Sequence, residues 1–394
     1  MTARIKVKWL SIQRKTIDPL DMPDGDLELW SIPDFDNGSP SITNRQSIGS
    51  SKKVVFPGDV LLSKIVPHIR RAWIVRESNL PQYASTEWLT FHSSKVRPEF
   101  LRYALLTDEF NRQMQLNSNG MGSLKRADPE KVGEQQINLP TIRKQKIIAD
   151  FLDKRLVAID AVLHQKSEQL KKLSTYRQSL ITRAVTKGLD PNVEMKDSGY
   201  DIANNIPIHW VTIKLQYLCK LATGNQDTQD AVPDGQYPFY VRSPTIERTN
   251  LVTYSGTGIL IAGDGVGAGK VFHYAEGQYG IHQRVYLLSE ISDLIDPKYL
   301  FFYIKTIFSC EVERGTAKST VPSIRMPMLT RFLVCVPPKR EQIEIRDYCQ
   351  KVEEKTEAIS EDIKNNIRLL KEYRSSLISA AVTGQLAIDE EASA

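Results

Sequence analysis

The chain of 394 residues carries a formal net charge of +5, and 41% of its residues are hydrophobic while 25% are charged. This is ordinary globular composition, and the length is sufficient for two or three hydrophobic cores rather than one. No run of about 18 apolar residues exists and the N-terminus lacks the apolar core of a signal peptide, so we expect a soluble cytoplasmic protein with no membrane partner.

The four cysteines all lie in the second half of the chain, without C-x-x-C spacing and away from the six histidines. Reduced thiols buried in a core fit this distribution better than a metal site or disulfides. We therefore predict no metal ligands among Cys219, Cys310, Cys335 and Cys349.

The first predicted domain, residues 1–139, has the pattern of mixed α/β structure with short strands. Apolar and β-branched runs predict strands, a longer amphipathic run predicts a helix, and a glycine-rich basic loop follows that helix. The expected strands are 52–65, 71–75 and 83–91, the expected helix is 98–116, and the loop is NSNGMGSLKRADPEKV from 117.

A long helix is predicted within residues 140–188, because neither proline nor glycine interrupts 141–186 and Gly188 stands at the position of a C-terminal cap. At 1.5 Å per residue this helix would be about 65 Å long. Its apolar positions alternate in steps of three and four, as in a coiled-coil seam. The seam residues are Leu152, Leu156, Ile159, Leu163, Lys166, Leu170, Leu173, Arg177, Leu180 and Ala184.

The second predicted domain, residues 189–336, repeats the layout of the first. Strands are expected at 256–265, 270–277 and 279–288, a helix at 297–313, and a basic loop RGTAKSTVPSIRMPM from 314. Its stretch GDGVGAGK at 263–270 is not a Walker loop, because Val271 follows the lysine and a strand continues; it also lacks the third glycine of a dinucleotide fingerprint. A glycine-rich hairpin tip is the better interpretation.

A second long helix is predicted within residues 337–386, before a C-terminal tail at 387–394. Neither proline nor glycine interrupts 339–383, and Gly384 follows as a cap. The downstream half continues the seam, whereas the upstream half places polar residues there and predicts it less clearly. Those upstream residues are Cys349, Glu353, Thr356 and Ser360.

The two helices are copies of one sequence. When the chain is aligned with itself at an offset of 197, 17 of the 51 residues from Pro140 to Asp190 are identical to their counterparts. Weaker matches extend the duplication into the blocks: GDVLLSK at 58 with TGILIAG at 257, PEFL at 98 with PKYL at 297, and Trp9 with Trp210. We expect two copies of one unit rather than a repeat array.

Charge predicts that the helices pair in opposite directions. Lysines gather in the C-terminal half of the first helix and acids in the N-terminal half of the second, and only antiparallel pairing brings them together. The predicted fold is therefore α+β: two mixed α/β domains separated by two long antiparallel coiled-coil helices, with pseudo-two-fold symmetry. Such a protein could place one domain on each half of a DNA site and use the helices as a ruler.

The loops of both blocks carry basic and polar side chains that suit phosphates and base edges. We found no catalytic motif, so a self-contained methyltransferase or nuclease lacks support, and a coiled-coil scaffold without a DNA role leaves the divergent basic loops unexplained. The DNA-binding candidates are Lys64, His68, Arg70, Arg71, Lys125, Arg126, Arg242, Lys270, His273, Lys318 and Arg325.

The layout, with the segments LPTIRKQKIIADFLD, YRQSLITRAVTKGLDPNVEMKDSG, IPIHW and EYRSSLISAAVTGQL, resembles the specificity subunit of type I restriction-modification enzymes over nearly the whole chain. The resemblance implies a non-catalytic subunit whose two target-recognition domains each read half of a split, asymmetric site on double-stranded DNA. It also implies that the helices set the gap and dock two methylation subunits, that restriction subunits join, and that the complex uses S-adenosylmethionine, ATP and Mg²⁺ while this chain binds no cofactor.

Two copies of one helix sequence can offer equivalent docking sites to two copies of a partner. The repeated phrase around residues 176 and 373 is therefore the predicted partner surface. Its candidates are Tyr176, Arg177, Ile181, Tyr373, Arg374 and Ile378.

Overall fold

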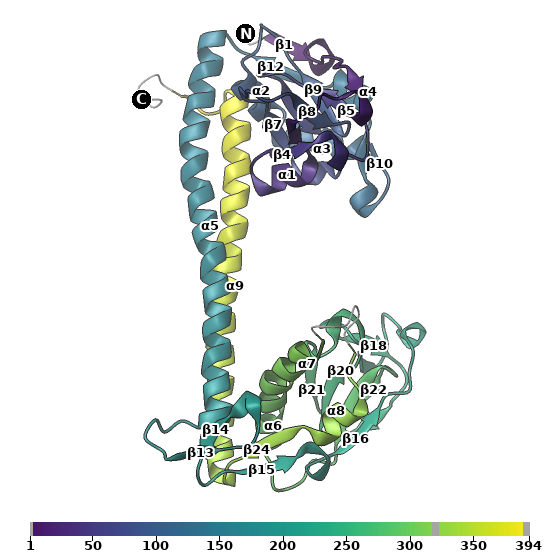
Figure 1. Cartoon of the computed structure of the whole chain (residues 1–394), viewed down its shortest axis with the longest axis vertical. Coiled ribbons are helices and arrows are strands. Elements are labelled where there is room, and N and C mark those ends of the chain that lie inside the picture. Colours follow the sequence, from purple (N-terminus) through teal and green to yellow (C-terminus); the bar gives the residue numbers. More distant parts are fainter. Residues whose placement is uncertain (1–2, 317–322, 389–394) are drawn as a thin grey trace. The chain divides into compact units, whose positions relative to one another are not determined.

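The computed structural model describes residues 3–316 and 323–388, and the chain divides into two compact units. The first unit is Met1–Ser167 with Lys364–Ala394, and the second is Glu168–Ile363. Each unit thus combines one globular block with half of each long helix, α5 (Ile142–Lys187) and α9 (Lys339–Thr383) (Figure 1). These units cut across the predicted domain boundaries, because side chains of the helices complete the hydrophobic core of each block.

The block of the first unit contains a five-stranded sheet of order β2-β5-β8-β3-β4 and a three-stranded sheet of order β7-β6-β9. Only β3 and β8 pair in parallel within these sheets. The elements are β1 (Ala3–Lys6), β2 (Thr16–Ile17), β3 (Asp26–Trp30), α1 (Ile32–Asn37), β4 (Ser41–Asn44), β5 (Lys52–Val54), β6 (Val60–Ser63), β7 (Ala72–Ile74), β8 (Gln82–Ser85), β9 (Trp88–Phe91), α2 (Pro98–Ala104), α3 (Asp108–Leu116), β10 (Ser118–Asn119), β11 (Arg126–Ala127), α4 (Pro129–Glu134) and β12 (Gln136–Leu139).

The block of the second unit contains two four-stranded sheets, of orders β16-β23-β20-β21 and β18-β17-β22-β19. Here β17 and β22 are the parallel pair. The elements are β13 (Met195–Asp197), β14 (Asn205–Pro207), β15 (Val211–Lys214), β16 (Lys220–Thr223), β17 (Tyr237–Tyr240), β18 (Glu247–Thr249), β19 (Tyr254–Ser255), β20 (Gly258–Ala262), β21 (Phe272–Ala275), β22 (Gln278–Ile281), β23 (Val285–Ser289), α6 (Pro297–Tyr303), α7 (Ser309–Thr316), α8 (Met326–Arg331) and β24 (Leu333–Val336).

The strand pairing confirms that the two blocks are copies of one scaffold. The central β6 pairs with β7 and β9, as β20 pairs with β21 and β23. In the other sheet, β3 pairs antiparallel with β4 and parallel with β8, as β17 does with β18 and β22. The predicted match of β6 with β20 is therefore correct. The match of α2 with α6 is supported by Arg97 and Asp296, which precede these helices, lie 199 residues apart and bond to the equivalent Gln145 and Gln342.

Strand register also fixes the equivalence near the start of each block. Ala3 of β1 pairs with Leu139, and Val211 of β15 pairs with Val336. Because Leu139 and Val336 correspond at the offset of 197, Ala3 corresponds to Val211. The offset at this end is therefore 208, larger than the matches between tryptophans suggested.

The predicted match between Trp9 and Trp210 is wrong. Trp9 follows β1 and is 71% exposed, whereas Trp210 precedes β15, is fully buried and donates a hydrogen bond from Nε1 to Glu341 at 3.1 Å. By register, the counterpart of Trp9 is Tyr217, which is 68% exposed. The similarity of KWLSI at 8–12 to HWVTI at 209–213 therefore does not reflect equivalent positions in the fold.

Several predicted elements are divided in the structure. The helix expected at 98–116 is interrupted between α2 and α3, whereas in the second block α6 continues through a π-helical segment, Ile304–Phe308, into α7. The run 52–65 forms two strands, β5 and β6, which belong to different sheets because Pro57 and Gly58 turn the chain between them.

A buried glutamine fixes each long helix to its own block. In the first unit, the backbone N–H of Arg97 donates to Gln145 Oε1 at 2.8 Å. Gln145 Nε2 donates to the carbonyls of Pro140, at 2.8 Å, and Lys95, at 3.3 Å. The side chain thus satisfies one donor and two acceptors where the chain enters α5.

The second unit repeats this arrangement with Gln342, the counterpart of Gln145 at offset 197. The backbone N–H of Asp296 donates to Gln342 Oε1 at 2.6 Å, and Nε2 donates to the carbonyls of Leu294 and Pro337 at 2.9 and 2.8 Å. Both glutamines are fully buried, so the repeat has retained the joint between block and helix.

The predicted seam is confirmed along α5. Every seam residue of this helix is buried or half-buried, whereas most of its neighbours between 160 and 180 are exposed. On α9, Cys349 and Thr356 are buried, and the Thr356 hydroxyl donates to the Val352 carbonyl at 2.7 Å. The seam therefore extends through the polar half of α9, because this threonine satisfies its own hydroxyl.

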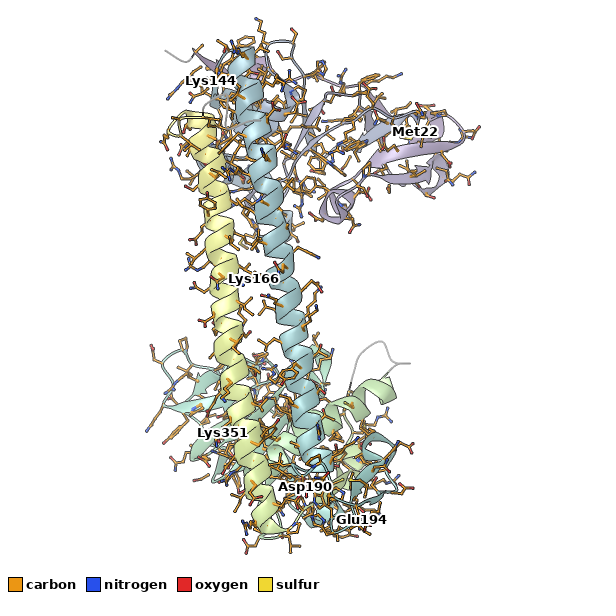
Figure 2. The ribbon with its side chains drawn as sticks, turned by 90° about the vertical axis from the view of Figure 1, so that its left-hand side faces the viewer. Met22, Lys144, Lys166, Asp190, Glu194 and Lys351 are labelled. Atoms are coloured by element: carbon orange, nitrogen blue, oxygen red, sulfur yellow. The ribbon has the colours of Figure 1, made fainter. Side chains whose placement is uncertain are left out.

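Two equivalent ion pairs join the helices in antiparallel directions. Within the first unit, Arg374 Nε lies 2.8 Å from Asp160 Oδ1, and within the second, Arg177 Nη1 lies 3.5 Å from Glu357 Oε2. Higher numbers on one helix meet lower numbers on the other, so the predicted direction is correct. Lys166, labelled in Figure 2, forms no interhelical pair among the described residues, and Lys171 pairs with Glu168 of its own helix.

The predicted capping glycines are confirmed, and three of the four cysteines are buried as predicted. Both helices end before a glycine in left-handed conformation, Gly188 at φ +72° and Gly384 at φ +80°. All four cysteines are free thiols, but Cys310 is only half-buried. Among the described residues no helix could span a membrane, and no cluster of residues could hold a metal ion.

Candidate nucleic-acid interface

The hairpins β6–β7 and β20–β21 have the same backbone conformation at their tips. Val66 and Arg70 have φ of 46° and 58°, and the residues 199 positions later, Gly265 and Gly269, have φ of 69° and 67°. Left-handed conformations are unfavourable for a β-branched residue such as valine, so the shared scaffold imposes this backbone. The stretch 263–270 is thus a hairpin tip, as predicted.

In each block, a segment later in the chain forms a backbone hydrogen bond with this hairpin. In the first block, Lys64 N donates to the Glu87 carbonyl at 3.1 Å and its own carbonyl accepts from Ala127 N at 2.7 Å. In the second block, Gly263 N donates to the Arg284 carbonyl at 2.9 Å and its carbonyl accepts from Ile324 N at 2.7 Å. These bonds bring three loops together at one edge of each block.

In the first block this edge carries a cluster of Lys64, Glu87 and Arg126. Glu87 lies 3.7 Å from Lys64 Nζ and 3.3 Å from Arg126 Nε. Lys53 lies behind them and donates from Nζ to the Trp88 carbonyl at 2.6 Å, and burial, aided by the charge of Lys64, lowers its pKa. The cluster contains more cations than acids, which favours a polyanionic ligand.

In the second block the same edge carries Arg242, Asp264 and Arg284. Asp264 accepts from Arg242 Nη1 at 3.0 Å and from Arg284 Nη1 at 2.9 Å. The side chains of Arg242 and Arg284 remain 45% and 62% exposed, so each can offer further donors to a ligand. His282 beside them is buried, and desolvation together with the charge of Arg242 lowers its pKa, so this imidazole is neutral at neutral pH.

The clusters occupy equivalent positions but place the charges in reverse. Glu87 of the β8–β9 turn corresponds at offset 197 to Arg284 of the β22–β23 turn. On the facing segment, the basic Lys64 corresponds to Gly263, and the acidic Asp264 follows that glycine. One scaffold therefore presents two different arrangements of donors and acceptors.

The structure brings together some of the predicted DNA-binding residues. Lys64, Lys125 and Arg126 share the edge of the first block, with the exposed His68 on the adjoining hairpin. In the second block, Asp264, the partner of Arg242, lies near the start of the loop that joins β20 to β21. The exposed Lys270 lies near the end of the same loop.

Other candidates have partners inside the protein. Arg71 is buried and holds Asp36 through two bonds of 2.7 Å, and Arg70 is bonded to Asp108, so both arginines are better explained by packing than by DNA binding. His273 is half-buried, and its Nε2 lies 3.3 Å from the Ser243 carbonyl. Arg325 is exposed at the start of α8, and Lys318 lies outside the described residues.

The sequence did not single out Glu87, Asp264, Arg284 or Lys53. Charge alone disfavours acidic residues beside DNA, but an acid that holds two cations fixes their positions on such a surface. Arg284 lies in a run that was predicted to be one strand, 279–288, but forms the turn between β22 and β23.

The predicted partner residues separate into three kinds. Tyr176 and Tyr373 are exposed at 59% and 58%, as a partner surface requires. Arg177 and Arg374 form the interhelical ion pairs. Ile181 and Ile378 are buried in the cores of the second and first units, so the structure assigns them to packing, and their proposed contact with a partner is corrected.

We expect Gly269→Ala to lower the free energy of unfolding of the second unit by about 3 kcal/mol, because a left-handed conformation and a crowded site both oppose the methyl group. An added Cβ would lie 2.7 Å from Val312. Gly277 has a similar φ of 84° but nothing within 4 Å, so Gly277→Ala should cost only about 1 kcal/mol. Urea denaturation of both variants tests this difference, and equal losses would contradict it.

Repeated blocks with basic loop clusters, each packed on the two long helices, define a duplicated protein with two surfaces that suit a polyanionic ligand. A family model described as the type I restriction modification DNA specificity domain matches residues 12–172 and 207–369, and the chain belongs to this family. The two matches coincide with the two copies found in the sequence.

Two relatives illustrate the similarity. The chain is 28% identical over 184 residues to the type I restriction enzyme EcoDI specificity subunit of Escherichia coli, an alignment that covers 47% of this chain and 40% of that relative. A solved structure described as "Structural basis underlying complex assembly and conformational transition of the type I R-M system" has a TM-score of 0.73 over 98% of both chains, at 19% identity. The second similarity supports the fold alone.

Proposed function

We propose that this chain is the DNA-recognition subunit of a type I restriction-modification complex and that each block reads one half of a bipartite, asymmetric site on double-stranded DNA. The observation that carries this proposal is the pair of loop clusters on one scaffold with reversed charges. Because the two clusters lie at equivalent positions, both can contact DNA in the same way. Because their side chains differ, each can recognise a different half-site sequence.

The helices would set the gap between half-sites and dock two methylation subunits, for which the exposed, repeated Tyr176 and Tyr373 are the best placed side chains. Restriction subunits would join the assembly. Catalysis with S-adenosylmethionine, ATP and Mg²⁺ belongs to those partners in this proposal, and a cytoplasmic location follows from the target.

Selection of bound sites from random duplexes, with the chain and its methylation subunit together, tests the proposal. The unaltered protein should enrich one split motif. Arg284→Ala should lose discrimination at one base pair of one half-site by about 1–3 kcal/mol if Arg284 contacts a base edge, or weaken all sequences if it contacts a phosphate. Lys64→Ala should act in the same way on the other half-site.

Lys214→Ala serves as a control, since this exposed lysine lies on β15 and outside the loop clusters. It should leave both half-sites unchanged. Enrichment of no split motif would instead favour a coiled-coil scaffold, and methylation by the chain alone would favour a self-contained methyltransferase.

A further inference from the structure

A carboxylate rests on a row of hydroxyl groups on α9 in the first unit. The Ser375 hydroxyl donates to Asp108 Oδ1 at 2.5 Å and the Ser379 hydroxyl donates to Oδ2 at 3.2 Å. The Asp108 backbone N–H donates to Ser379 Oγ at 2.9 Å, and Arg70 Nη1 lies 2.6 Å from Oδ1. Burial opposes ionisation of this carboxyl, but the bonds from Ser375 and Arg70 hold the pKa of Asp108 below its usual value.

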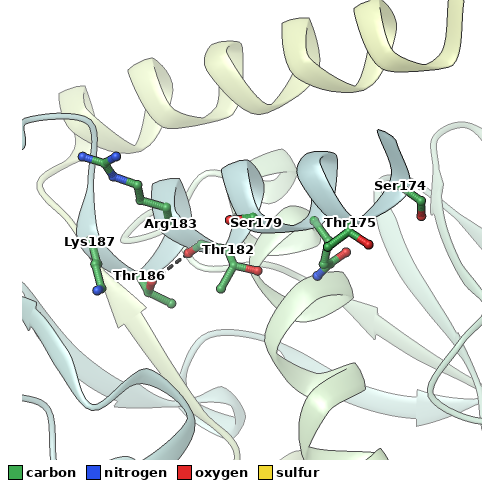
Figure 3. A pocket seen from close by; sticks show the side chains of 8 residues that line it. Ser174, Thr175, Ser179, Thr182, Arg183, Thr186 and Lys187 are labelled. Carbon is green, nitrogen blue, oxygen red and sulfur yellow. Dashed lines mark hydrogen bonds between the residues drawn. The ribbon is translucent and has the colours of Figure 1, made fainter. Parts of the chain in front are cut away.

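The corresponding row on α5 is open in the second unit. At offset 197, Ser375 and Ser379 correspond to Gln178 and Thr182, which keep an amide and a hydroxyl at these positions. They lie along a groove of about 900 Å³ on α5 (Figure 3), in which the Thr186 hydroxyl donates to the Thr182 carbonyl at 2.7 Å. The other residues along the groove are Ser174, Thr175, Ser179, Arg183 and Lys187.

Among the described residues, the positions that supply this group in the first unit carry no charged side chain in the second. Arg70 corresponds to Gly269, and at the offset of 199 that relates α2 to α6, Asp108 corresponds to the buried Ile307. Neither residue supplies a carboxylate.

The α5 groove instead carries its own positive charge. Arg183 and Lys187 stand where α9 has Ala380 and Gly384. Both side chains are exposed, and neither forms an ion pair with a described side chain of 3–312 or 323–388. In the first unit the cation beside the carboxylate comes from the block, through Arg70, whereas here the helix itself provides two cations.

We propose that the α5 groove binds an acidic side chain of the methylation subunit, in the way that α9 binds Asp108. The proposal rests on the function proposed above. The hydrogen-bonding groups at Gln178 and Thr182 match those that hold a carboxylate on α9, and Arg183 and Lys187 complement its charge. Because Asp108 fills the equivalent row on α9, each chain offers one such groove.

The test is the affinity of the full chain for the purified methylation subunit, measured by calorimetry at two salt concentrations. The double variant Arg183→Glu/Lys187→Glu should bind about tenfold more weakly at low salt and lose most of its salt dependence. The control Lys351→Glu/Lys355→Glu makes the same charge change at the same spacing on exposed residues of α9 in the same unit; Lys351 is labelled in Figure 2. It should change the affinity by less than about twofold.

Three outcomes are informative. Equal weakening by the two double variants would overturn the proposal, since general electrostatics would then explain the loss. Unchanged subunit affinity with weaker binding of a random 30-base-pair duplex would also overturn it, because the groove would then bind phosphate. If the unaltered chain binds neither the subunit nor DNA, the proposed function itself fails; circular dichroism of each variant checks that it is folded.

Discussion

Gln342→Met will lower the free energy of unfolding of the second unit by about 3 kcal/mol. The thioether has a similar volume, but it leaves Asp296 N and the carbonyls of Leu294 and Pro337 without the bonds that Gln342 now supplies. Each buried polar group left without a partner costs about 1–3 kcal/mol, and partial relaxation of the helix start should recover some of the total. Urea denaturation followed by hydrogen exchange of the second unit would measure the loss.

Gln145→Met provides the matched experiment, because Gln145 makes the same three kinds of bond in the first unit. It should give a similar loss, confined to that unit. Gln165→Met is the control, since Gln165 is exposed on α5 and should change stability by less than about 0.5 kcal/mol. Strongly unequal losses at the two equivalent positions would show that the joints are not energetically equivalent.

The helical half of the fold could be predicted because its signals are local and repeated. An uninterrupted run, a capping glycine and a three-four periodicity specify α5 and α9 without knowledge of any distant residue. Even the polar residues at the seam of α9 obey the register, since Thr356 satisfies its hydroxyl within the helix. Because the two helices are copies of one sequence, each is expected to pack on a similar block.

The blocks were harder to predict because their order depends on contacts between distant residues. Strand register, not residue identity, showed that Trp9 corresponds to Tyr217. A short run such as 52–65 cannot reveal that its two strands enter different sheets, since each strand is too short to carry a distinct period.

The sequence indicates the loops that carry the candidate site but not the ion pairs within them. The basic loops were recognised from composition, yet Arg71 is neutralised by Asp36, a partner that only the folded chain brings close. Conversely, Asp264 belongs to the candidate site because it accepts hydrogen bonds from Arg242 and Arg284, which lie on other loops. Charge in a sequence identifies a surface, whereas ion pairs determine which cations on that surface remain available to a ligand.

Insertion of seven residues after Ser167 in α5 and after Ile363 in α9 should lengthen the gap between the recognised half-sites by about three base pairs. Seven helical residues add about 10.5 Å, close to the length of three base pairs at about 3.4 Å each. A whole heptad keeps the seam residues on the facing sides, with a residual rotation of about 20°. Sequencing of methylated positions in cells that express the complex gives the gap directly.

Insertion in α5 alone is the control, because it shifts one helix against the other and separates Arg177 from Glu357. We expect that variant to lose recognition of the split site, whereas the double insertion keeps it. The half-site sequences themselves should stay the same, since the loop clusters that would read them lie in blocks that the insertion does not touch. Altered half-sites with an unchanged gap would refute the role of the helices as a ruler, because the added length would then have been absorbed without moving the recognition surfaces along the DNA.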